Sequence, residues 1–414
     1  MATLALSVII VSRHRPDWLG RCLKAVAQLD YSRFETVVVA CPAGASVARD
    51  AGTARVVDFD QPNISAARNA GVDAASGDVV LFLDDDAVPE PTWLSHLAAA
   101  FDDPDVVQAG GTTLGRNGIT PQHGAALVDA TGLSHTLQVS SDAPTIVTPT
   151  NACRPRLHGT NMALRRAVVQ SLGGFDDRFA FYLDETDLTY RVSQAGGKTM
   201  FVPKAVVHHA SGPSRFRTAD RTPQQVFEIA ASAAVFHTKH CPLHAREAAR
   251  DAFLTERRAW LVRHMQNGAL PPDRAWGLIR ELSAGYTNGL TRTASPAISW
   301  TRDAAPWIAE RLAASRDLYL VATGRTATDI RARAKTLVAQ GARVTVFDYR
   351  ANARYHRVSF TDDGYWLHTG GVFGRETRGD PIFRTRTRKE RVAQTLVRLD
   401  GIRSKNPLIL EVKT

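Results

Sequence analysis

Apolar and polar positions follow two alternating patterns over the first hundred residues. Short, continuous apolar runs, typical of buried strands, alternate with stretches that have the three-to-four-residue spacing of amphipathic helices. The predicted strands are 6–12, 34–40 and 78–83, and the predicted helices are 15–29, 64–76 and 91–101. Strands that alternate with helices pair in parallel through helical crossovers, so this pattern predicts an α/β fold.

The rest of the chain is less uniform. Residues 105–165 are rich in Thr and Gly and carry no regular pattern, whereas 224–266 is helical with a basic face. Pro, Gly and Ser interrupt 268–312, where we expect a boundary. A second strand–helix–strand pattern and a hairpin follow. The predicted parts are residues 1–240, a helical extension and linker at 241–312, and a smaller α/β unit at 313–414.

The bulk composition is that of a globular protein of 414 residues with a net charge of +10. Its four cysteines are widely spaced, which argues for a reducing compartment and against a structural zinc site. The apolar run at the N-terminus is short and follows no basic residue, so we expect a strand there and not a signal peptide. No stretch reaches the length of a membrane span. We therefore expect a cytoplasmic location.

Three consecutive aspartates, Asp84, Asp85 and Asp86, end the predicted strand at 78–83. In parallel α/β sheets, ligands bind at the carboxyl ends of the strands. Carboxylates clustered there repel one another unless a cation is present, and Mg²⁺ and Mn²⁺ prefer oxygen ligands. The alternative is that Asp86 only caps the following helix.

Four segments match one known family in order: SVIIVSRHRPDWLGRCL, NISAARNAGVDAASGDVVLFLDDD, HGTNMALRRAVVQSLGGFDDRF and YLDETDLTYRVSQAGGKTMFVPKAVVHH. Over residues 4–240 the chain resembles the family 2 inverting glycosyltransferases with the GT-A fold, a Rossmann-like fold that binds nucleotide-diphospho-sugars. The resemblance implies a metal-dependent hexosyltransferase that moves a sugar from such a donor, by default a UDP-sugar, to a hydroxyl of a glycan or lipid-linked saccharide. That activity belongs to polysaccharide or glycoconjugate biosynthesis.

The resemblance also implies roles for individual residues. Asp84 and Asp86 would hold Mn²⁺ or Mg²⁺ and the donor ribose, with Asp85 between them. One histidine of the His208–His209 pair would complete the metal site, and the spacing from Pro203 favours His209. The remaining donor-binding residues implied by the resemblance are Arg68, Asn69 and Asn161.

A carboxylate at the start of the predicted helix near residue 185 would take the proton from the acceptor hydroxyl. The family commonly has Asp there, whereas the matching residue here is Glu185, with Asp184 as the other candidate. Either carboxylate can act as a general base. Asp187 can instead pair with Arg191 one turn later and fill a structural role.

The chain departs from the family after its second strand, where an acidic residue usually contacts the nucleotide. Ala40, Cys41 and Pro42 stand there, and Asp58 or Asp60 is a candidate substitute. The C-terminal unit is outside the resemblance, and we interpret it as an accessory domain; its 322–329 loop lacks the glycine pattern of dinucleotide sites. A second catalytic domain is the alternative there. For the whole chain, the alternative is a non-catalytic carbohydrate-binding or scaffold protein with this fold.

The expected partners are a nucleotide-sugar donor and a saccharide acceptor, without nucleic acid, because no nucleic-acid motif is present. Peripheral contact with the inner face of a membrane is a further expectation. It depends on five arginines beside apolar residues in the segment 244–264: Arg246, Arg250, Arg257, Arg258 and Arg263, with Phe253, Trp260 and Leu261. The alternative is that Trp260 and Leu261 pack inside the protein.

Overall fold

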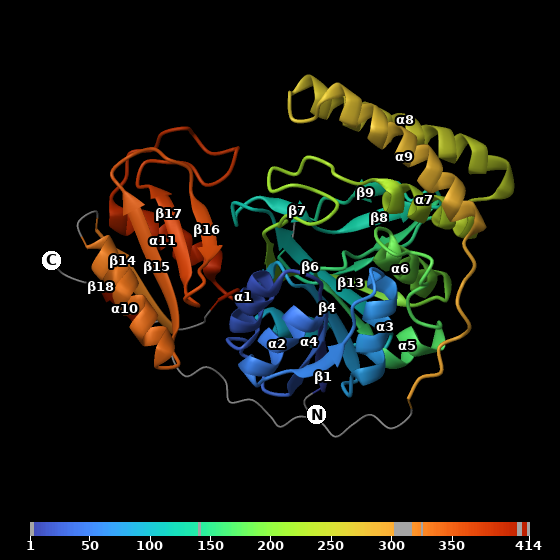
Figure 1. The fold of residues 1–414 in the computed structure, drawn as a ribbon. Helices are drawn as coiled ribbons and strands as arrows, with labels where there is room; N and C mark the ends of the chain where they lie inside the picture. The colour runs from blue at the N-terminus through green and yellow to red at the C-terminus, as the bar shows by residue number, and fades with distance from the viewer. Residues whose placement is uncertain (1–3, 140–141, 302–316, 324–325, 404–407, 412–414) are drawn as a thin grey trace.

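The computed structural model describes residues 4–139, 142–301, 317–323, 326–403 and 408–411 (Figure 1). Its largest element is a ten-stranded sheet whose main path runs β10-β13-β6-β12-β4-β1-β2-β3. The strands of this path are β1 (Leu6–Ser12), β2 (Phe34–Ala40), β3 (Arg55–Asp58), β4 (Val79–Asp84), β6 (Val106–Leu114), β10 (Thr145–Val147), β12 (Met162–Arg165) and β13 (Lys198–His209). Two short strands join its margin, β5 (Ala87–Pro89) beside β13 and β7 (Pro121–His123) beside β6.

The strand directions bring several carboxyl ends to one edge of this sheet. β1 is parallel to β2 and β4, and β12 runs antiparallel between β4 and β6. Because β13 is parallel to β6, it points the same way as β1 and β4. Ser12, Asp84 and His209, the last residues of β1, β4 and β13, therefore share the edge where α/β sheets bind ligands.

Helices cover both faces of the sheet, as expected for strands that are buried and apolar throughout. One face packs against α1 (Pro16–Val26), α2 (Pro42–Ala51) and α4 (Trp93–Ala100). The other packs against α3 (Ile64–Ala74), α5 (Arg166–Ser171) and α6 (Asp184–Gln194). The predicted α/β class is therefore confirmed.

The segment without a sequence pattern, residues 105–165, contains strands as well. Besides β6, β7, β10 and β12, it forms a three-stranded sheet of β11 (Cys153–Arg156), β8 (Ala126–Asp129) and β9 (Ser134–Thr136). These three strands have only three or four residues each, too few to show an alternating pattern.

Three helices follow the main sheet: α7 (Phe227–His240), α8 (Arg246–Gln266) after a short 3₁₀ turn at Leu243–Ala245, and α9 (Pro272–Thr291). The expectation that residues 268–312 are broken throughout is wrong for 272–291. Pro272 is tolerated in the first helical turn. Gly285 and Gly289 lie where α9 meets α7, and a Cβ there would collide with the carbonyl oxygens of Phe227 and Ala231. Gly285 and Gly289, which the sequence pattern treats as helix breakers, therefore allow α9 to pack closely against α7.

The three helices enclose an apolar cluster that includes residues of the segment 244–264. Leu261 is fully buried between α7, α8 and α9, and Trp260 and Phe253 pack against the same cluster. The alternative that Trp260 and Leu261 pack inside the protein therefore holds for Leu261, and Trp260 is half-buried. Peripheral contact with a membrane stays a prediction. Among the described residues, no helix has both the length and the apolar character that crossing a bilayer requires.

The C-terminal unit is a second, smaller α/β structure, as predicted. Its sheet has the order β16-β17-β15-β14-β18, and its strands are parallel except for the β16–β17 hairpin. The strands are β14 (Asp317–Ala322), β15 (Arg343–Arg350), β16 (Arg357–Phe360), β17 (Trp366–Gly371) and β18 (Leu408–Glu411). Two helices, α10 (Ala327–Ala339) and α11 (Arg388–Leu399), pack on its opposite faces.

The C-terminal unit packs beside α1 and the β6–β7 turn of the large sheet (Figure 1). The backbone N–H of Val358 donates to the carbonyl oxygen of Asn117 at 2.9 Å. At the surface, Arg21 pairs with Asp362 at 2.7 Å. A buried apolar cluster also joins the units, with Ala25, Val88 and Ile119 on one side and Val358, Phe360 and Trp366 on the other. The two units therefore meet through apolar, backbone and charged contacts. The boundaries drawn at residues 240 and 312 stay predictions.

Candidate active site

The structure brings Asp84, Asp86 and His209 together at the shared strand edge. Their ligand atoms all lie within 4.8 Å of one another. His209 Nε2 is 3.3 Å from Asp86 Oδ1 and 3.9 Å from Asp84 Oδ2. Burial opposes the charge of the imidazole, but the two aspartates outweigh it and raise the pKa of His209. His208 points elsewhere: its Nε2 lies 2.8 Å from Glu90 Oε1.

Asp85, the middle aspartate, is turned away from that group and fully buried. Its Oδ2 accepts from Ser12 Oγ at 2.8 Å and from Arg15 Nε at 3.1 Å. Arg15 also donates to Asp86 Oδ2 at 3.2 Å. Because Arg15 bridges two of the three aspartates, it offsets part of their repulsion and fixes the strand end. Sequence reasoning did not single out Arg15, although it lies in the first matching segment.

The candidate base lies at the start of α6, after an unusual turn. Tyr182 and Leu183 have φ values of 78° and 64°, in the left-handed region that bulky residues rarely adopt. Such residues cost about 1–3 kcal/mol each and persist only where the surrounding structure enforces them. Here they place Asp184 and Glu185 in the first turn of the helix.

Asp184 is the more enclosed of the two carboxylates. It is 2% exposed, and its Oδ2 accepts from Arg68 Nη1. Burial raises the pKa of Asp184, while Arg68 opposes that change. Arg68 also lies 3.5 Å from Asp84 Oδ1 and donates to the carbonyl oxygen of Gly159 at 3.3 Å. Arg68 therefore links the acidic strand end to the start of α6.

Glu185 is more accessible than Asp184. Its side chain is 14% exposed, and its Oε1 accepts from Arg156 Nη2 at 3.4 Å. Burial disfavours its charge, but Arg156 and Arg68 hold the pKa of Glu185 below its usual range. Asp187, by contrast, is fully buried among Arg191, Lys239 and His240, each 2.8 Å from one of its oxygens. The predicted pairing of Asp187 with Arg191 one turn later is confirmed.

The structure places Asn69 and Asn161 inside the scaffold. The Asn69 side chain makes two bonds of 2.8 Å with the backbone of Phe175. The Asn161 carbonyl accepts from Trp93 Nε1 at 2.8 Å, and its amide donates to Thr112 and Ala205. Both amides are occupied within the fold, an arrangement that suits positioning, and their contact with a donor stays a prediction.

Two histidines that sequence reasoning missed lie beside the acidic group. His123 and His158 stack with ring centroids 3.9 Å apart. Burial and Arg156 lower the pKa of His123 to about 4, and His209 and Glu185 also act on it. The stacked pair is therefore neutral at physiological pH and lies within electrostatic reach of both the acidic group and the candidate base. His158 opens the third matching segment, HGTNMALRRAVVQSLGGFDDRF, but nothing in that segment indicates that it stacks on His123.

A cavity of about 440 Å³ lies beside the end of β1, next to residues that hold the aspartates. Ser12 and Arg15, which hold Asp85, form part of its wall. Aromatic rings form another part: Phe181 and Phe216 stack at 3.7 Å, and Phe59 lies in the same lining. The cavity thus joins an aromatic wall to the charged strand edge.

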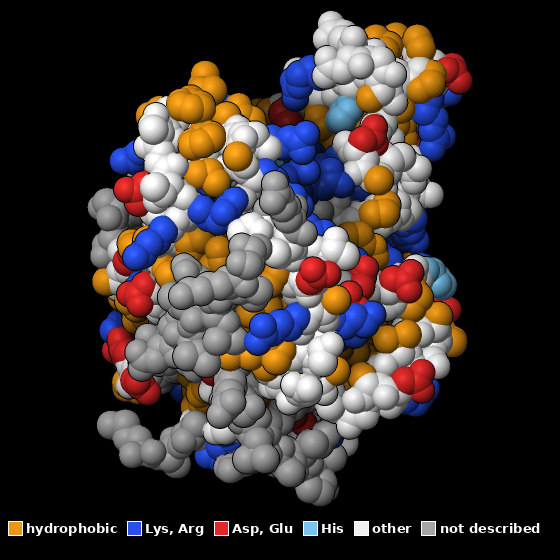
Figure 2. All heavy atoms as spheres, turned by 90° about the vertical axis from the view of Figure 1, so that its left-hand side faces the viewer, with side chains coloured by type: hydrophobic (Ala, Val, Ile, Leu, Met, Phe, Trp, Pro, Cys, Tyr) orange, Lys and Arg blue, Asp and Glu red, His pale blue; other side chains and the backbone are white. Residues whose placement is uncertain are grey.

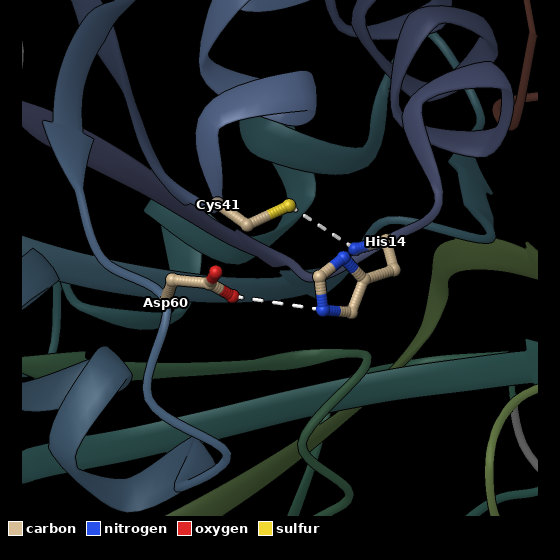
Figure 3. A group of neighbouring side chains, drawn as sticks. All are labelled: His14, Cys41 and Asp60. Atoms are coloured by element: carbon tan, nitrogen blue, oxygen red, sulfur yellow. Dashed lines mark hydrogen bonds and ion pairs between the residues drawn. The ribbon is translucent and has the colours of Figure 1, made fainter.

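A second group of metal-ligand side chains, His14, Cys41 and Asp60, lies near this cavity (Figure 3). The Cys41 Sγ accepts from the His14 backbone N–H at 3.2 Å, and His14 Nε2 lies 3.6 Å from Asp60. Asp60 also pairs with Arg13 at 2.9 Å, so its charge is already partnered. Of the two candidate substitutes for the family's acidic residue, Asp60 lies near the cavity, whereas Asp58 pairs with Arg49 at the surface.

The strand edge and its acidic group have the arrangement that the resemblance to glycosyltransferases implies. The family model described as "Glycosyltransferase like family 2" matches residues 4–226. The chain therefore belongs to glycosyltransferase family 2. The predicted fold, a GT-A domain followed by a smaller α/β unit, is confirmed.

Similar proteins carry names of the same kind. The chain is 32% identical to the O-antigen biosynthesis protein RfbC of Myxococcus xanthus, over 54% of this chain and 18% of that protein. It is 29% identical to the pre-mycofactocin glycosyltransferase of Mycobacterium tuberculosis, over 35% and 29% of the two chains. It thus spans less than a third of either relative's length.

Two more matches cover larger shares. Glycosyltransferase AglE of Haloferax volcanii is 24% identical over 50% of this chain and 67% of that protein. Among solved structures, the mannosyltransferase PcManGT from Pyrobaculum calidifontis, in complex with GDP-Man and Mn²⁺, is 16% identical. That match covers 70% of this chain and 88% of the other, with a TM-score of 0.43.

Proposed function

We propose that this chain is a metal-dependent glycosyltransferase that transfers a sugar from a nucleotide-diphospho-sugar to a hydroxyl of a glycan or lipid-linked saccharide, with inversion at the anomeric carbon. The observation that carries the proposal is the convergence of Asp84, Asp86 and His209 within 4.8 Å at the strand edge, with Glu185 on a neighbouring element. A UDP-sugar is the default donor.

The donor set fits a divalent cation. Two carboxylates and one imidazole nitrogen offer hard and borderline ligands, a combination that suits Mn²⁺ better than Mg²⁺. When bound, such an ion supplies positive charge for the departing diphosphate. Arg15 donates to Asp85 and Asp86, and Arg68 lies 3.5 Å from Asp84, so the two guanidinium groups orient these carboxylates.

The cavity beside the acidic group is the proposed nucleotide site. Its Phe59, Phe181 and Phe216 offer flat apolar surfaces of the kind on which bases stack. Its wall reaches the acidic strand end at Ser12 and Arg15. A nucleotide that lies along this wall directs its phosphates toward Asp84 and Asp86.

Glu185 is the proposed general base. It is the more exposed carboxylate, and its lowered pKa keeps it ionised at neutral pH. Asp184 is committed to Arg68 and holds that guanidinium between the strand edge and α6. Glu185 takes the proton from the acceptor hydroxyl as that oxygen attacks, and no covalent enzyme intermediate is needed for a single displacement.

A screen of nucleotide sugars tests the function. Purified chain with Mn²⁺ should release nucleoside diphosphate from one donor, through hydrolysis or transfer, and the Glu185→Gln variant should bind that donor but not turn it over. The competing class is a non-catalytic carbohydrate-binding protein with this fold. Binding of saccharides without release of nucleoside diphosphate from any donor would favour that class.

A further inference from the structure

A second cleft lies in the C-terminal unit, separate from the acidic group. Its volume is about 750 Å³, and its wall is strongly basic. Figure 2, which views the molecule from the side of the C-terminal unit, shows Lys and Arg side chains gathered in a hollow toward the top of that face. The arginines that line the cleft are Arg331, Arg350, Arg354, Arg357, Arg375 and Arg378.

The topology of the C-terminal sheet assembles this cleft. β15 and β17 are parallel neighbours, so the loops that follow them start at the same sheet edge. The loop after β15 carries Arg354 and leads to Arg357, and the loop after β17 carries Arg375 and Arg378. This is the edge at which α/β sheets bind ligands.

The two acids in the lining are already neutralised. Asp348 pairs with Arg331 at 2.7 Å and with Arg350 at 2.9 Å. Glu376 lies 2.7 Å from the guanidinium of the fully buried Arg391. Neither carboxylate therefore offsets the charge of the arginines on the two loops.

Those loop arginines are open to a ligand. Within the part of the chain that the structure describes, the side chains of Arg354, Arg357 and Arg378 make no hydrogen bond or ion pair, and all three residues are exposed. Arg375 donates to Tyr355 Oη at 2.6 Å and to the carbonyl oxygen of Arg378, and it forms no ion pair with a carboxylate of the described residues. Four guanidinium groups thus converge without a counter-charge.

The cleft lies close to the candidate active site. The turn between β6 and β7 separates the two: Asn117 and Thr120 line the arginine cleft, whereas Gly115 and Arg116 line a small cavity with Asp86, His209 and other residues of the acidic strand end. A ligand several sugar units long can therefore reach from one side of this turn to the other.

We propose that the arginine cleft binds the phosphate groups of an anionic saccharide. An acceptor that carries phosphate or diphosphate esters is such a ligand. Guanidinium groups bind phosphate through paired, charge-assisted hydrogen bonds, and four of them around one cleft suit a ligand with at least two negative charges. The assignment of that phosphate to the acceptor rests on the proposed function. The anion site itself does not.

A buried chain of hydrogen bonds fixes this cleft relative to the catalytic sheet. His356 and Glu376 line the cleft, and His356 Nε2 lies 3.0 Å from His368 Nδ1. The chain continues from His368 through Arg403 to Glu90 and ends at His208, next to the candidate metal ligand His209. The C-terminal unit therefore holds its arginines in a defined place beside the active site.

The test is calorimetric titration of the full chain in low-salt buffer with EDTA, so that the acidic group cannot recruit phosphate through a divalent ion. Inorganic pyrophosphate stands for a diphosphate ester, and glycerophosphoglycerol stands for a phosphodiester of a polymer. The cleft variant is Arg354→Gln/Arg357→Gln/Arg378→Gln. We expect it to bind pyrophosphate at least tenfold more weakly than the wild type, with an unchanged melting temperature.

Tighter binding of pyrophosphate than of glycerophosphoglycerol by the wild type points to a diphosphate ester as the ligand, and the reverse points to a phosphodiester.

The matched control removes three arginines from α8 and α9: Arg258→Gln/Arg263→Gln/Arg280→Gln, all exposed. It loses the same charge, so its affinity should stay within twofold of the wild type. Absence of pyrophosphate binding by the wild type, or equal weakening in both variants, overturns the anion site. A chain that binds pyrophosphate through the cleft but uses no sugar donor keeps the site and refutes the proposed function.

Discussion

Arg403→Met is the substitution that most directly probes how the two units are joined. Arg403 is 2% exposed and donates to Glu90 through Nε at 2.8 Å and Nη2 at 2.5 Å. It also contacts His368 Nε2 at 2.9 Å and lies over the Trp366 ring at 4.1 Å. Methionine keeps the apolar contact with the ring but removes the charge, so Glu90 is left buried with His208 as its remaining side-chain partner.

The expected cost follows from that isolation. Breaking a buried ion pair by removing one partner costs about 3–5 kcal/mol. At about 2–4 °C per kcal/mol, the value for domains of 150–250 residues, the melting temperature should fall by roughly 6–20 °C. Differential scanning calorimetry measures this shift.

Two further variants separate the buried charge from the contact itself. Glu90→Gln in the Arg403→Met background removes the buried charge and keeps an acceptor for His208, so it should recover much of the lost stability. Arg21→Met breaks the exposed Arg21–Asp362 pair between the same units and should cost less than about 1 kcal/mol. A loss of stability in Arg403→Met no larger than that in Arg21→Met would refute the proposed cost of the unpaired Glu90. A double variant no more stable than Arg403→Met alone would refute it as well.

Three more outcomes are expected. Glu185→Gln should keep donor binding while transfer falls by roughly 10²–10⁴, the contribution of a general base; a loss below tenfold in a transfer assay would point to Asp184. Burial opposes the charge of Glu90, but Arg403 and His208 hold its pKa at about 2, so the stability that Glu90 contributes is present above about pH 4.5 and is lost as the pH falls toward 2. The melting temperature of Glu90→Gln should therefore fall less steeply with acid than that of the wild type. Equal slopes of melting temperature against pH would contradict this. Gly289→Ala should lower the melting temperature, because its methyl group would collide with the backbone of α7. The control Gly277→Ala, which lies on the same helix with open space around it, should raise the melting temperature slightly. Equal effects of the two substitutions would disprove the close-packing role of Gly289.

The strand end was predictable because its chemistry is local. Asp84 and Asp86 directly follow a buried apolar run, and the direction of a parallel strand fixes the sheet edge at which such residues lie. The start of α6 was predictable for a similar reason, since Asp184 and Glu185 directly precede a helical pattern. The resemblance added His209, which lies at the end of a strand far along the chain.

Contacts between distant segments were not predictable. Arg15 reaches Asp85 and Asp86 only after β1 and β4 have paired, and nothing in its own neighbourhood distinguishes it from other surface arginines. Glu90 and Arg403 are separated by 313 positions and carry no shared pattern. The helix α9 was not predicted, because glycine has a low helix propensity and Gly285 and Gly289 therefore indicate a break. In the structure both glycines lie inside the helix, where they allow α9 to pack closely against α7.

The central claim is that Asp84, Asp86 and His209 hold a metal ion that sugar transfer requires. The decisive measurement is the initial rate of nucleoside diphosphate release from the accepted donor, with Mn²⁺, after EDTA, and after Mn²⁺ is restored. The wild type should lose its activity in EDTA and regain it with Mn²⁺, and Asp86→Ala should be inactive throughout with an unchanged fold. Asp105→Ala, which removes an exposed carboxylate paired with Lys198, should behave as the wild type. Full activity in EDTA, or in Asp86→Ala, would contradict the account.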